Sequence, residues 1–221
     1  MRVNYLVPVY NERDTVKKVV DKLSALPLDK EIIVVDDGST DGTSEVLSSL
    51  NGIRLIRHDK NRGKGAAIIT GLKEISEGIV VIQDADLELD PSETPALARA
   101  IKDRGRDVVF GTRLKGHRAL TMGYICNHLL AAFTNLIFGS SLTDVMTCYK
   151  VMDVRILKAL KLRSAGFDVE AEITAKLLSS GYRIKEVPVS YRMRTKKEGK
   201  KIRLVDGAGV LYALLRSKGK V

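Results

Sequence analysis

Two carboxylates, Asp84 and Asp86, stand one residue apart directly after the apolar run GIVVIQ (residues 78–83). A run rich in isoleucine and valine is typical of a buried strand. Carboxylates held close together are unfavourable unless a cation lies between them. Since residues two apart on an extended chain project to the same side, both could reach one ion. The pattern therefore indicates a site for Mg²⁺ or Mn²⁺, which prefer oxygen ligands and bridge nucleotide phosphates, although D-x-D also occurs by chance in loops.

Three further strands in the first half also end in polar segments. Residues 2–9 precede YNE (10–12) and a helix to about residue 25, residues 31–35 precede DDGSTDGT (36–43), and residues 53–57 precede NRGKG (61–65), which opens another helix. Strand, polar turn and helix in repetition are typical of βαβ units and a parallel sheet. Ligands bind outside the carboxyl ends of such strands, so all four segments are predicted to share one ligand-binding edge.

The motifs resemble a known family. VPVYNE (7–12), VVDDGSTDGT (34–43), NRGKG (61–65) and DADLE (84–88) resemble the nucleotide-diphospho-sugar domain of glycosyltransferase family 2. GTR (111–113), LTDVMTCYK (142–150), GFDVEAEIT (166–174) and RTKKEGKKI (194–202) narrow the resemblance to polyprenyl-phosphate hexose synthases, the dolichyl-phosphate mannose and glucose synthases. It covers roughly residues 1–215. It implies an α/β fold of the GT-A type, with a Rossmann-like, mostly parallel sheet and helices on both faces.

The composition predicts one domain. The 221 residues, 44% of them hydrophobic, suffice for one core, and no repeat or linker divides them. We expect a single catalytic domain over 1–221, with a nucleotide-sugar and metal-binding half (1–113), an acceptor-binding half (114–201) and a basic amphipathic segment (202–221). Cys126 and Cys148 are predicted to be reduced core thiols of a cytosolic protein, with a disulfide as the alternative.

No apolar run is long enough to cross a membrane. The start of the chain runs straight into a strand, which leaves no room for a signal peptide. Residues 129–138 are the most apolar stretch, but they are short and contain Thr134 and Asn135, so a buried helix is predicted. We therefore expect a cytoplasmic protein attached peripherally to the cytoplasmic face of a membrane, directly or through a membrane partner protein.

The net charge of +10 is concentrated near the end of the chain. Residues 192–203 contain seven basic residues and one acid, and residues 202–218 carry Leu204, Ala208, Leu211 and Leu215 at helical spacing. A basic amphipathic helix can lie on an anionic membrane surface. Packing of the same stripe on the core is the alternative. No zinc motif or aromatic interleaving supports nucleic acid as a partner.

On the donor side, the resemblance implies a nucleotide-sugar and a Mg²⁺ or Mn²⁺ ion that stabilises the departing diphosphate. It implies metal binding by Asp84, Asp86 and Glu88, and nucleotide binding by Pro8, Tyr10, Glu12, Asp37, Lys64 and Asp84. An alternative for Glu88 is a solvent-facing acid beside Asp90, which caps the next helix. Asp41 is predicted to form a turn. GDP-mannose is the favoured donor, with UDP-glucose or another UDP-sugar as alternatives.

On the acceptor side, a polyprenyl phosphate is already ionised and needs cations rather than a general base. The predicted phosphate ligands are Arg113, Arg118, Arg192, Arg194, Lys200 and Lys201, and Asp86 and Arg113 are the predicted catalytic residues. For a hydroxyl acceptor, Asp168 or Glu170 would be the base, although Glu170 and Glu172 could simply begin a helix. Asp144 and Lys150 lie near the diphosphate by resemblance, or form an ordinary ion pair. The resemblance implies inversion at the anomeric carbon.

Other functions fit less well. Residues 63–68 lack the last glycine of a dinucleotide-binding loop, and no P-loop motif occurs. His58, His117 and His128 have no metal-ligand spacing. The rival hypotheses are a family 2 enzyme with a saccharide hydroxyl acceptor, a nucleotidyltransferase sharing the sheet, and a non-catalytic membrane-binding module.

Overall fold

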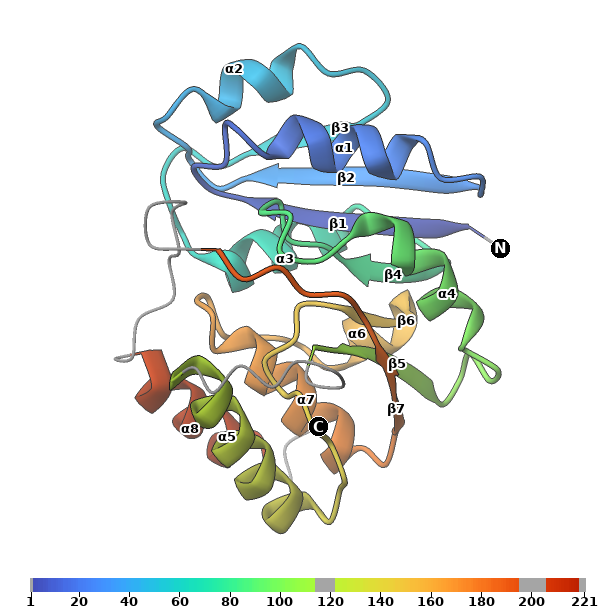
Figure 1. The fold of residues 1–221 in the computed structure, drawn as a ribbon, viewed down its shortest axis with the longest axis vertical. Helices are drawn as coiled ribbons and strands as arrows, with labels where there is room; N and C mark the ends of the chain where they lie inside the picture. The colour runs from blue at the N-terminus through green and yellow to red at the C-terminus, as the bar shows by residue number, and fades with distance from the viewer. Residues whose placement is uncertain (1, 114–121, 195–205, 219–221) are drawn as a thin grey trace.

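The computed structural model describes residues 2–113, 122–194 and 206–218, which build one seven-stranded sheet (Figure 1). The strands are β1 (Val3–Val9), β2 (Lys30–Asp36), β3 (Arg54–Arg57), β4 (Ile79–Ile82), β5 (Asp107–Thr112), β6 (Lys150–Asp153) and β7 (Arg183–Pro188), in the order β3-β2-β1-β4-β6-β5-β7. β1 to β4 pair in parallel, as do β5 and β7, whereas β6 runs antiparallel between β4 and β5. The predicted mostly parallel sheet is confirmed.

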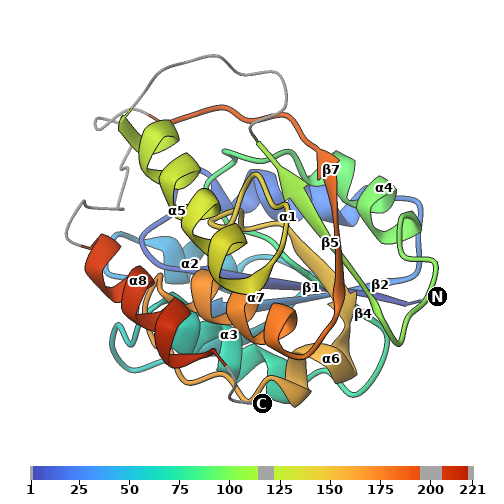
Figure 2. The same cartoon turned by 90° about the horizontal axis from the view of Figure 1, so that it is seen from below.

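Helices cover both faces of this sheet (Figure 2). They are α1 (Val16–Ser24), α2 (Thr43–Ser48), α3 (Lys64–Lys73), the 3₁₀ turn η1 (Pro91–Glu93), α4 (Thr94–Arg99), α5 (Met122–Phe138), α6 (Val154–Ala159), α7 (Val169–Ser179) and α8 (Asp206–Arg216). α1 and α3 lie on opposite faces, as expected when the chain reverses its direction of winding. The four predicted strands and the helices at residues 16 and 64 are confirmed.

The core explains why these segments are strands. Every residue of β1, β4, β5 and β6 is buried, which is typical of strands covered on both faces. β1 is flanked by β2 on one side and by β4 on the other, so the order of winding reverses between β1 and β4. A ligand crevice forms outside such a reversal point. The segments that follow β1 and β4 contain Glu12 and Asp84.

α5 differs from the buried helix predicted for residues 129–138. Ala131 and Thr134 are buried, but Leu129 is 67% exposed and Leu136 is 84% exposed. The sequence prediction was wrong for this face because a short apolar run does not reveal which of its residues meet the core.

α8 confirms the helix predicted within residues 202–218, but the residues that it buries differ from the predicted apolar stripe. Val210, Ala213 and Leu214 pack on Ala171 and Ala175 of α7, whereas the predicted stripe residues Leu211 and Leu215 are exposed. Leu204 lies outside the described residues, and the side chain of Ala208 is not described. The core-packing alternative is therefore confirmed for one face of the helix, and contact of the other face with a membrane remains a prediction.

The prediction that both cysteines lie in the core is confirmed for Cys148 and wrong for Cys126, which lies on α5. Cys126 is exposed, Cys148 is buried, and both are free thiols. Within the described ranges, none of the helices combines the length and apolar character needed to span a bilayer.

Candidate functional site

The crevice between β1 and β4 collects carboxylates from two strand ends. Glu12 follows β1, and the Asp84–Glu88 turn follows β4. The chain turns at residues 85 and 86 instead of remaining extended, so Asp84 and Asp86 contact different basic side chains. The expectation that both would project to one side of an extended chain is therefore wrong.

Asp84 pairs with Lys64, the first residue of α3. Lys64 Nζ lies 2.7 Å from Asp84 Oδ1 and 3.0 Å from Oδ2, and 2.8 Å from Glu170 Oε1 on α7. Burial alone would raise the pKa of Asp84, but the ammonium of Lys64 outweighs it and holds that pKa below its ordinary value. Lys64 therefore links the end of β4 to α7, which carries Glu170.

Glu170 is enclosed between two lysines. Its Oε2 accepts a 2.5 Å hydrogen bond from Lys150 Nζ, which also donates to the carbonyls of Val145 and Thr147 and lies over the ring of Phe110. Burial lowers the pKa of Lys150, partly offset by the charge of Glu170. Glu170 is 2% exposed. Lys150 therefore pairs with Glu170 and not with Asp144, so the predicted ion pair between Asp144 and Lys150 is wrong. The pair isolates Glu170 from solvent.

The glycines of NRGKG explain how Lys64 reaches Glu170. A Cβ on Gly65 would lie 2.1 Å from the carbonyl oxygen of Ser164, and one on Gly63, whose φ is +98°, would lie 2.4 Å from that of Ala165. Only glycine allows the start of α3 to approach the 164–166 segment this closely. Ala66 N also donates to the Ala165 carbonyl. The motif therefore brings the two halves of the site together.

Asp86 and Glu88 contact the segment that follows β7. Glu88 accepts hydrogen bonds from the Tyr191 hydroxyl at 3.0 Å and from the Arg194 backbone amide at 2.9 Å. Arg194 Nη2 lies 3.3 Å from Asp86 Oδ2. Burial of Asp86 beside Asp84 raises its pKa to about 7. Glu88 is partly buried, so the alternative of a solvent-facing acid is wrong, whereas Asp90 caps η1 as predicted.

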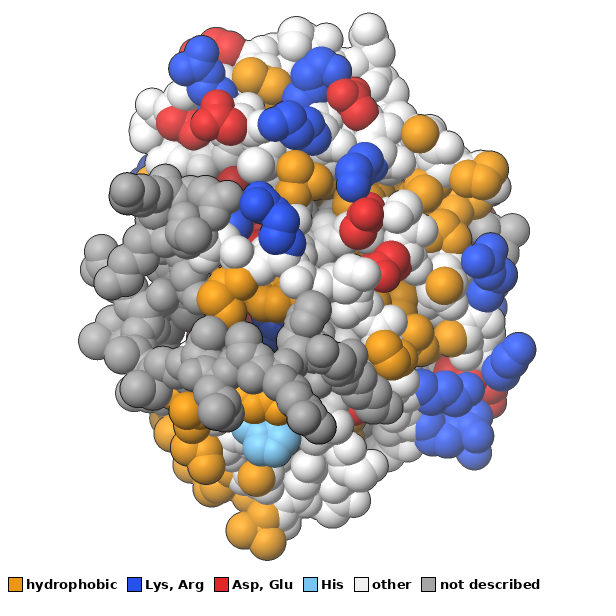
Figure 3. Space-filling model, viewed as in Figure 1, with side chains coloured by type: hydrophobic (Ala, Val, Ile, Leu, Met, Phe, Trp, Pro, Cys, Tyr) orange, Lys and Arg blue, Asp and Glu red, His pale blue; other side chains and the backbone are white. Residues whose placement is uncertain are grey.

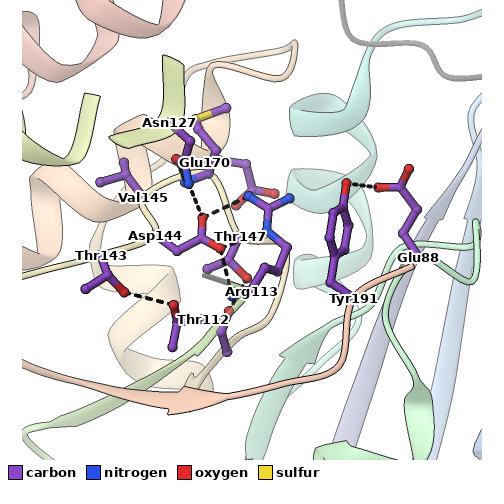
Figure 4. Close-up of polar contacts among 12 residues, drawn as sticks. Glu88, Thr112, Arg113, Asn127, Thr143, Asp144, Val145, Thr147, Glu170 and Tyr191 are labelled. Carbon is purple, nitrogen blue, oxygen red and sulfur yellow. Dashed lines mark hydrogen bonds and ion pairs between the residues drawn. The ribbon is translucent and has the colours of Figure 1, made fainter. Parts of the chain in front are cut away.

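Arg113 lies at the end of β5, across from this carboxylate cluster (Figure 4). Its Nε and Nη2 donate to the two oxygens of Asp144 at 2.7 and 2.8 Å, and Asn127 donates to Asp144 at 2.8 Å. The guanidinium carbon also lies 5.2 Å from the ring centre of Tyr191. Although burial disfavours the charge, the carboxylate of Asp144 keeps the pKa of Arg113 above its ordinary value. The bonds to Asp144 thus fix the guanidinium of Arg113 beside Tyr191, whose hydroxyl contacts Glu88.

Asp37 is part of a buried network at the end of β2. Its carboxylate accepts the backbone N–H groups of Arg62 at 3.0 Å and Gly63 at 2.7 Å, and lies 2.6 Å from His58 Nδ1. His58 Nε2 lies 2.9 Å from the hydroxyl of Thr70. Asp37 thus shapes the NRGKG loop, and its predicted contact with ribose remains a prediction.

The other predicted donor residues lie along the same edge. Pro8 is buried inside β1, and Tyr10 is half-buried immediately after it. Asp41 accepts the backbone amides of Thr43 at 3.0 Å and Arg13 at 3.2 Å, which confirms it as a turn former. Nucleotide contacts of Pro8 and Tyr10 remain predictions.

The predicted acceptor residues are only partly brought together. Arg113 and Arg194 face the carboxylate cluster, whereas Arg192 is exposed and lines a groove of about 680 Å³ beside Leu87 and Glu88. Asp168 precedes α7 and lies 3.9 Å from Arg216. Arg118, Lys200 and Lys201 lie outside the described residues.

Four contacts in this region were not predicted from the sequence. They are Glu12 with Arg194, Glu88 with Tyr191, Asp37 with His58, and Lys64 with Glu170. The partners in the first are 182 residues apart, and no local pattern relates them. Only the presence of opposite charges in segments already assigned to the site could have suggested it.

The carboxylates present fit a hard divalent cation by their chemistry. Glu12, Asp84, Asp86 and Glu88 offer oxygen ligands only, which suits Mg²⁺ or Mn²⁺. Burial, followed by the nearby charge of Asp84, raises the pKa of Asp86, and a bound cation would oppose both effects. Across residues 2–113, 122–194 and 206–218, however, no three acidic, histidine or cysteine side chains are arranged together as a ready metal site. The residues are suitable, while their present partners are Lys64 and Arg194.

The family model for glycosyl transferase family 2 matches residues 5–160. Dolichol-phosphate mannosyltransferase of Pyrococcus furiosus is 31% identical over 219 residues, and the match covers 90% of this chain but 59% of that protein. UDP-N-acetylglucosamine–dolichyl-phosphate N-acetylglucosaminyltransferase of Methanococcus voltae is 28% identical over 242 residues, covering 98% of this chain and 96% of that protein.

The fold is also that of solved glycosyltransferases. Glucosyl-3-phosphoglycerate synthase of Mycobacterium tuberculosis, solved with Mn²⁺, UDP and phosphoglyceric acid, superimposes with a TM-score of 0.77 at 23% identity. The match covers 98% of this chain and 78% of that one, which confirms the GT-A fold. With the family model matched over residues 5–160, this chain belongs to glycosyl transferase family 2.

Proposed function

We propose that this protein is a metal-dependent, inverting glycosyltransferase that moves a hexose from a nucleotide-sugar to a polyprenyl phosphate at a membrane surface. GDP-mannose is the favoured donor, and UDP-glucose or another UDP-sugar is the alternative. The observation that supports this most is the meeting of three donor-half carboxylates with Arg194 from the acceptor-binding half. They are Glu12, Asp86 and Glu88. The names of the relatives from Pyrococcus furiosus and Methanococcus voltae, both acting on dolichyl phosphate, favour the same acceptor class.

The roles divide between the two sides of the crevice. Asp84, Asp86 and Glu88 would hold Mg²⁺ or Mn²⁺, which neutralises the departing diphosphate. Glu12, Tyr10 and Asp37 would bind the nucleoside. Arg113 would bind the acceptor phosphate, since a guanidinium matches phosphate oxygens in a two-pronged geometry.

An ionised acceptor is favoured over a saccharide hydroxyl because the nearest buried acid is not available as a base. Glu170 is sealed between Lys64 and Lys150, so it cannot reach a substrate proton without breaking both pairs. Asp168 remains the candidate base for a hydroxyl acceptor. A phosphate oxygen needs no base and would be positioned by cations alone.

A peripheral membrane position is supported by the apolar faces of α5 and α8. These helices lie side by side in both views, and hydrophobic side chains gather over them at the lower left of Figure 3. Among the described residues, all exposed large hydrophobic side chains except Met193 belong to these two helices: Ile125, Leu129, Leu136, Leu211, Tyr212 and Leu215. Exposed apolar patches of this kind often mark interaction surfaces.

The function is tested by incubating the protein with Mn²⁺ or Mg²⁺, a polyprenyl phosphate and separate GDP- and UDP-sugars, followed by mass spectrometry of the lipid. We expect one donor to give a lipid-linked sugar, lost on chelation and in Asp84→Asn but retained in the matched surface variant Asp21→Asn. Transfer only to saccharide hydroxyls would contradict the acceptor. Retained turnover in Asp84→Asn would contradict the metal assignment.

The membrane position is tested separately, by sedimentation with anionic phospholipid vesicles. We expect Leu129→Ser/Leu215→Ser to lose most of the vesicle-bound fraction while remaining folded. Equal binding of the variant and the parent protein would show that these faces do not contact lipid.

A further inference from the structure

Arg194 occupies the centre of the carboxylate cluster in a way that the proposed acceptor role does not explain. Its Nη1 and Nη2 lie 2.8 and 3.0 Å from the two oxygens of Glu12, and Nη2 lies 3.3 Å from Asp86. Its Nε lies 4.0 Å from Glu88. One guanidinium thus faces three of the carboxylates from the segments that follow β1 and β4.

The arrangement is buried and geometrically specific. The side chains of Arg194 and Glu12 are each 8% exposed, and the pair has the parallel two-pronged form that is strongest between a guanidinium and a carboxylate. Burial would lower the pKa of Arg194, but its bonds to Glu12 and the neighbouring negative charges raise it instead. The site therefore already contains a permanent cation.

The segment that carries Arg194 is itself attached to the donor half. The backbone amide of Arg192 donates to the carbonyl of Glu88 at 2.9 Å, and Tyr191 forms a β-bridge with Leu89. The Arg194 backbone amide donates to Glu88. These contacts hold the guanidinium at the point where Asp86 and Glu88 would otherwise face a metal ion.

We infer that Arg194 and the divalent cation compete for Asp86 and Glu88, so that cation binding displaces the guanidinium from the cluster and releases it to bind the acceptor phosphate. Two cations cannot share the same carboxylate oxygens at bonding distance without repulsion. The segment that carries Arg194 also contacts Arg113, whose guanidinium carbon lies 5.2 Å from the ring centre of Tyr191. The release of Arg194 to an acceptor phosphate rests on the proposed function, whereas the competition between Arg194 and the cation does not.

Competition predicts an order of binding. Before the cation binds, the guanidinium of Arg194 is paired with Glu12. A phosphate that approaches this segment would also be repelled by the carboxylates of Asp86 and Glu88. After the cation binds, the carboxylates are neutralised and the guanidinium is available. The acceptor phosphate is therefore expected to bind second.

The competition is tested by titrating nucleotide-free protein with Mn²⁺ and following the electron paramagnetic resonance signal of the free ion. We expect Arg194→Gln to bind Mn²⁺ about tenfold more tightly than the parent protein, because the ion no longer displaces a charge-assisted pair. Arg194→Lys, which keeps the charge but loses the two-pronged geometry, should lie between them. Arg99→Gln, the same charge change on the exposed end of α4, should match the parent protein.

The release is tested by measuring binding of farnesyl monophosphate with and without Mn²⁺. In the parent protein Mn²⁺ should tighten binding of this isoprenyl phosphate, and in Arg194→Gln the gain should be largely lost although the ion is bound. Circular dichroism checks that each variant is folded.

The outcomes separate the inference from the proposed function. Equal Mn²⁺ affinity in Arg194→Gln and the parent protein would overturn the competition, and an equal gain in farnesyl phosphate binding would overturn the release. Neither titration contains a nucleotide-sugar. A failure of sugar transfer with every donor would therefore leave both results interpretable.

Discussion

Several carboxylates in the two regions of the molecule have different kinds of partner. In the amino-terminal region, residues 2–100, Asp37 accepts two backbone amides and Asp41 accepts two more. In the carboxy-terminal region, residues 107–218, Asp144 pairs with Arg113 and Glu170 pairs with Lys150. Backbone amide donors are present whatever side chain a residue carries, proline excepted, whereas a basic side chain is removed by one substitution. Asp144 and Glu170 should therefore be more sensitive than Asp37 to the loss of one partner side chain.

The largest effect is expected from Lys150→Met. Lys150 is fully buried, and its loss leaves Glu170 with Lys64 as its remaining cation. Breaking a buried pair at one partner typically costs about 3 kcal/mol or more. Urea denaturation should show a fall of this size in the free energy of unfolding. A fall below about 1 kcal/mol would show that Lys64 alone compensates Glu170 and would weaken the contrast between the regions.

A smaller effect is expected where the two regions touch. In Gly65→Ala the new methyl group would meet the Ser164 carbonyl, and overpacking of this kind costs about 2 kcal/mol. The displacement should also move Lys64 away from Glu170 and Asp84. Denaturation gives the loss in stability, and Mn²⁺ titration shows whether the site is disturbed.

Gly123→Ala is the matched control for this change. Nothing lies within 4 Å of the position that its Cβ would take on α5, so the variant should be as stable as the parent or more stable by up to about 1 kcal/mol. Equal losses in both glycine variants would show that the close approach at Gly65 does not limit the fold.

A still smaller effect is expected from His58→Phe in the amino-terminal region. The variant removes the contact to Asp37 and the contact to Thr70, but Asp37 keeps the backbone amides of Arg62 and Gly63. The loss of these two hydrogen bonds, with both backbone amides retained, should cost about 1.5 kcal/mol, measured by urea denaturation. A loss as large as that of Lys150→Met would remove the distinction between the two regions.

The contrast between the regions also explains how much could be predicted from the sequence. The carboxyl ends of β1, β2 and β4 are marked by local patterns of alternating apolar runs and polar turns, so the edge that holds Glu12, Asp37 and Asp84 could be located in advance. The side chains that pair with these residues could not be predicted from the sequence. Arg194 reaches Glu12 across 182 residues, and such a pairing depends on the path of the whole chain.

The same reason accounts for the error at α5. The exposure of Leu129 and Leu136 depends on which neighbours pack against the helix, and α7 contacts only one side of it. Apolar composition predicted a helix there but not its buried face. Likewise, the turn at residues 85 and 86 separates Asp84 from Asp86 although the D-x-D spacing favoured a shared direction.

The last prediction concerns a carboxylate that combines both kinds of partner and should show its effect only in acid. Asp107 in β5 accepts the backbone amides of Lys102 and Asp103, and it pairs with Lys185 at 2.6 Å and Arg183 at 2.8 Å. The hydrogen bond from Lys185, followed by the Asp103 amide, holds the pKa of Asp107 well below its ordinary value.

Because this pKa is lower in the folded than in the unfolded protein, the carboxylate stabilises the fold above the unfolded value of about 4. That contribution is lost progressively as the pH falls below about 4 towards the folded pKa. Urea denaturation between about pH 7 and pH 3 should therefore show a smaller acid-induced loss in Asp107→Asn than in the parent protein. Identical pH profiles would mean that neither the basic side chains nor the backbone amides lower the pKa of Asp107 in the folded protein.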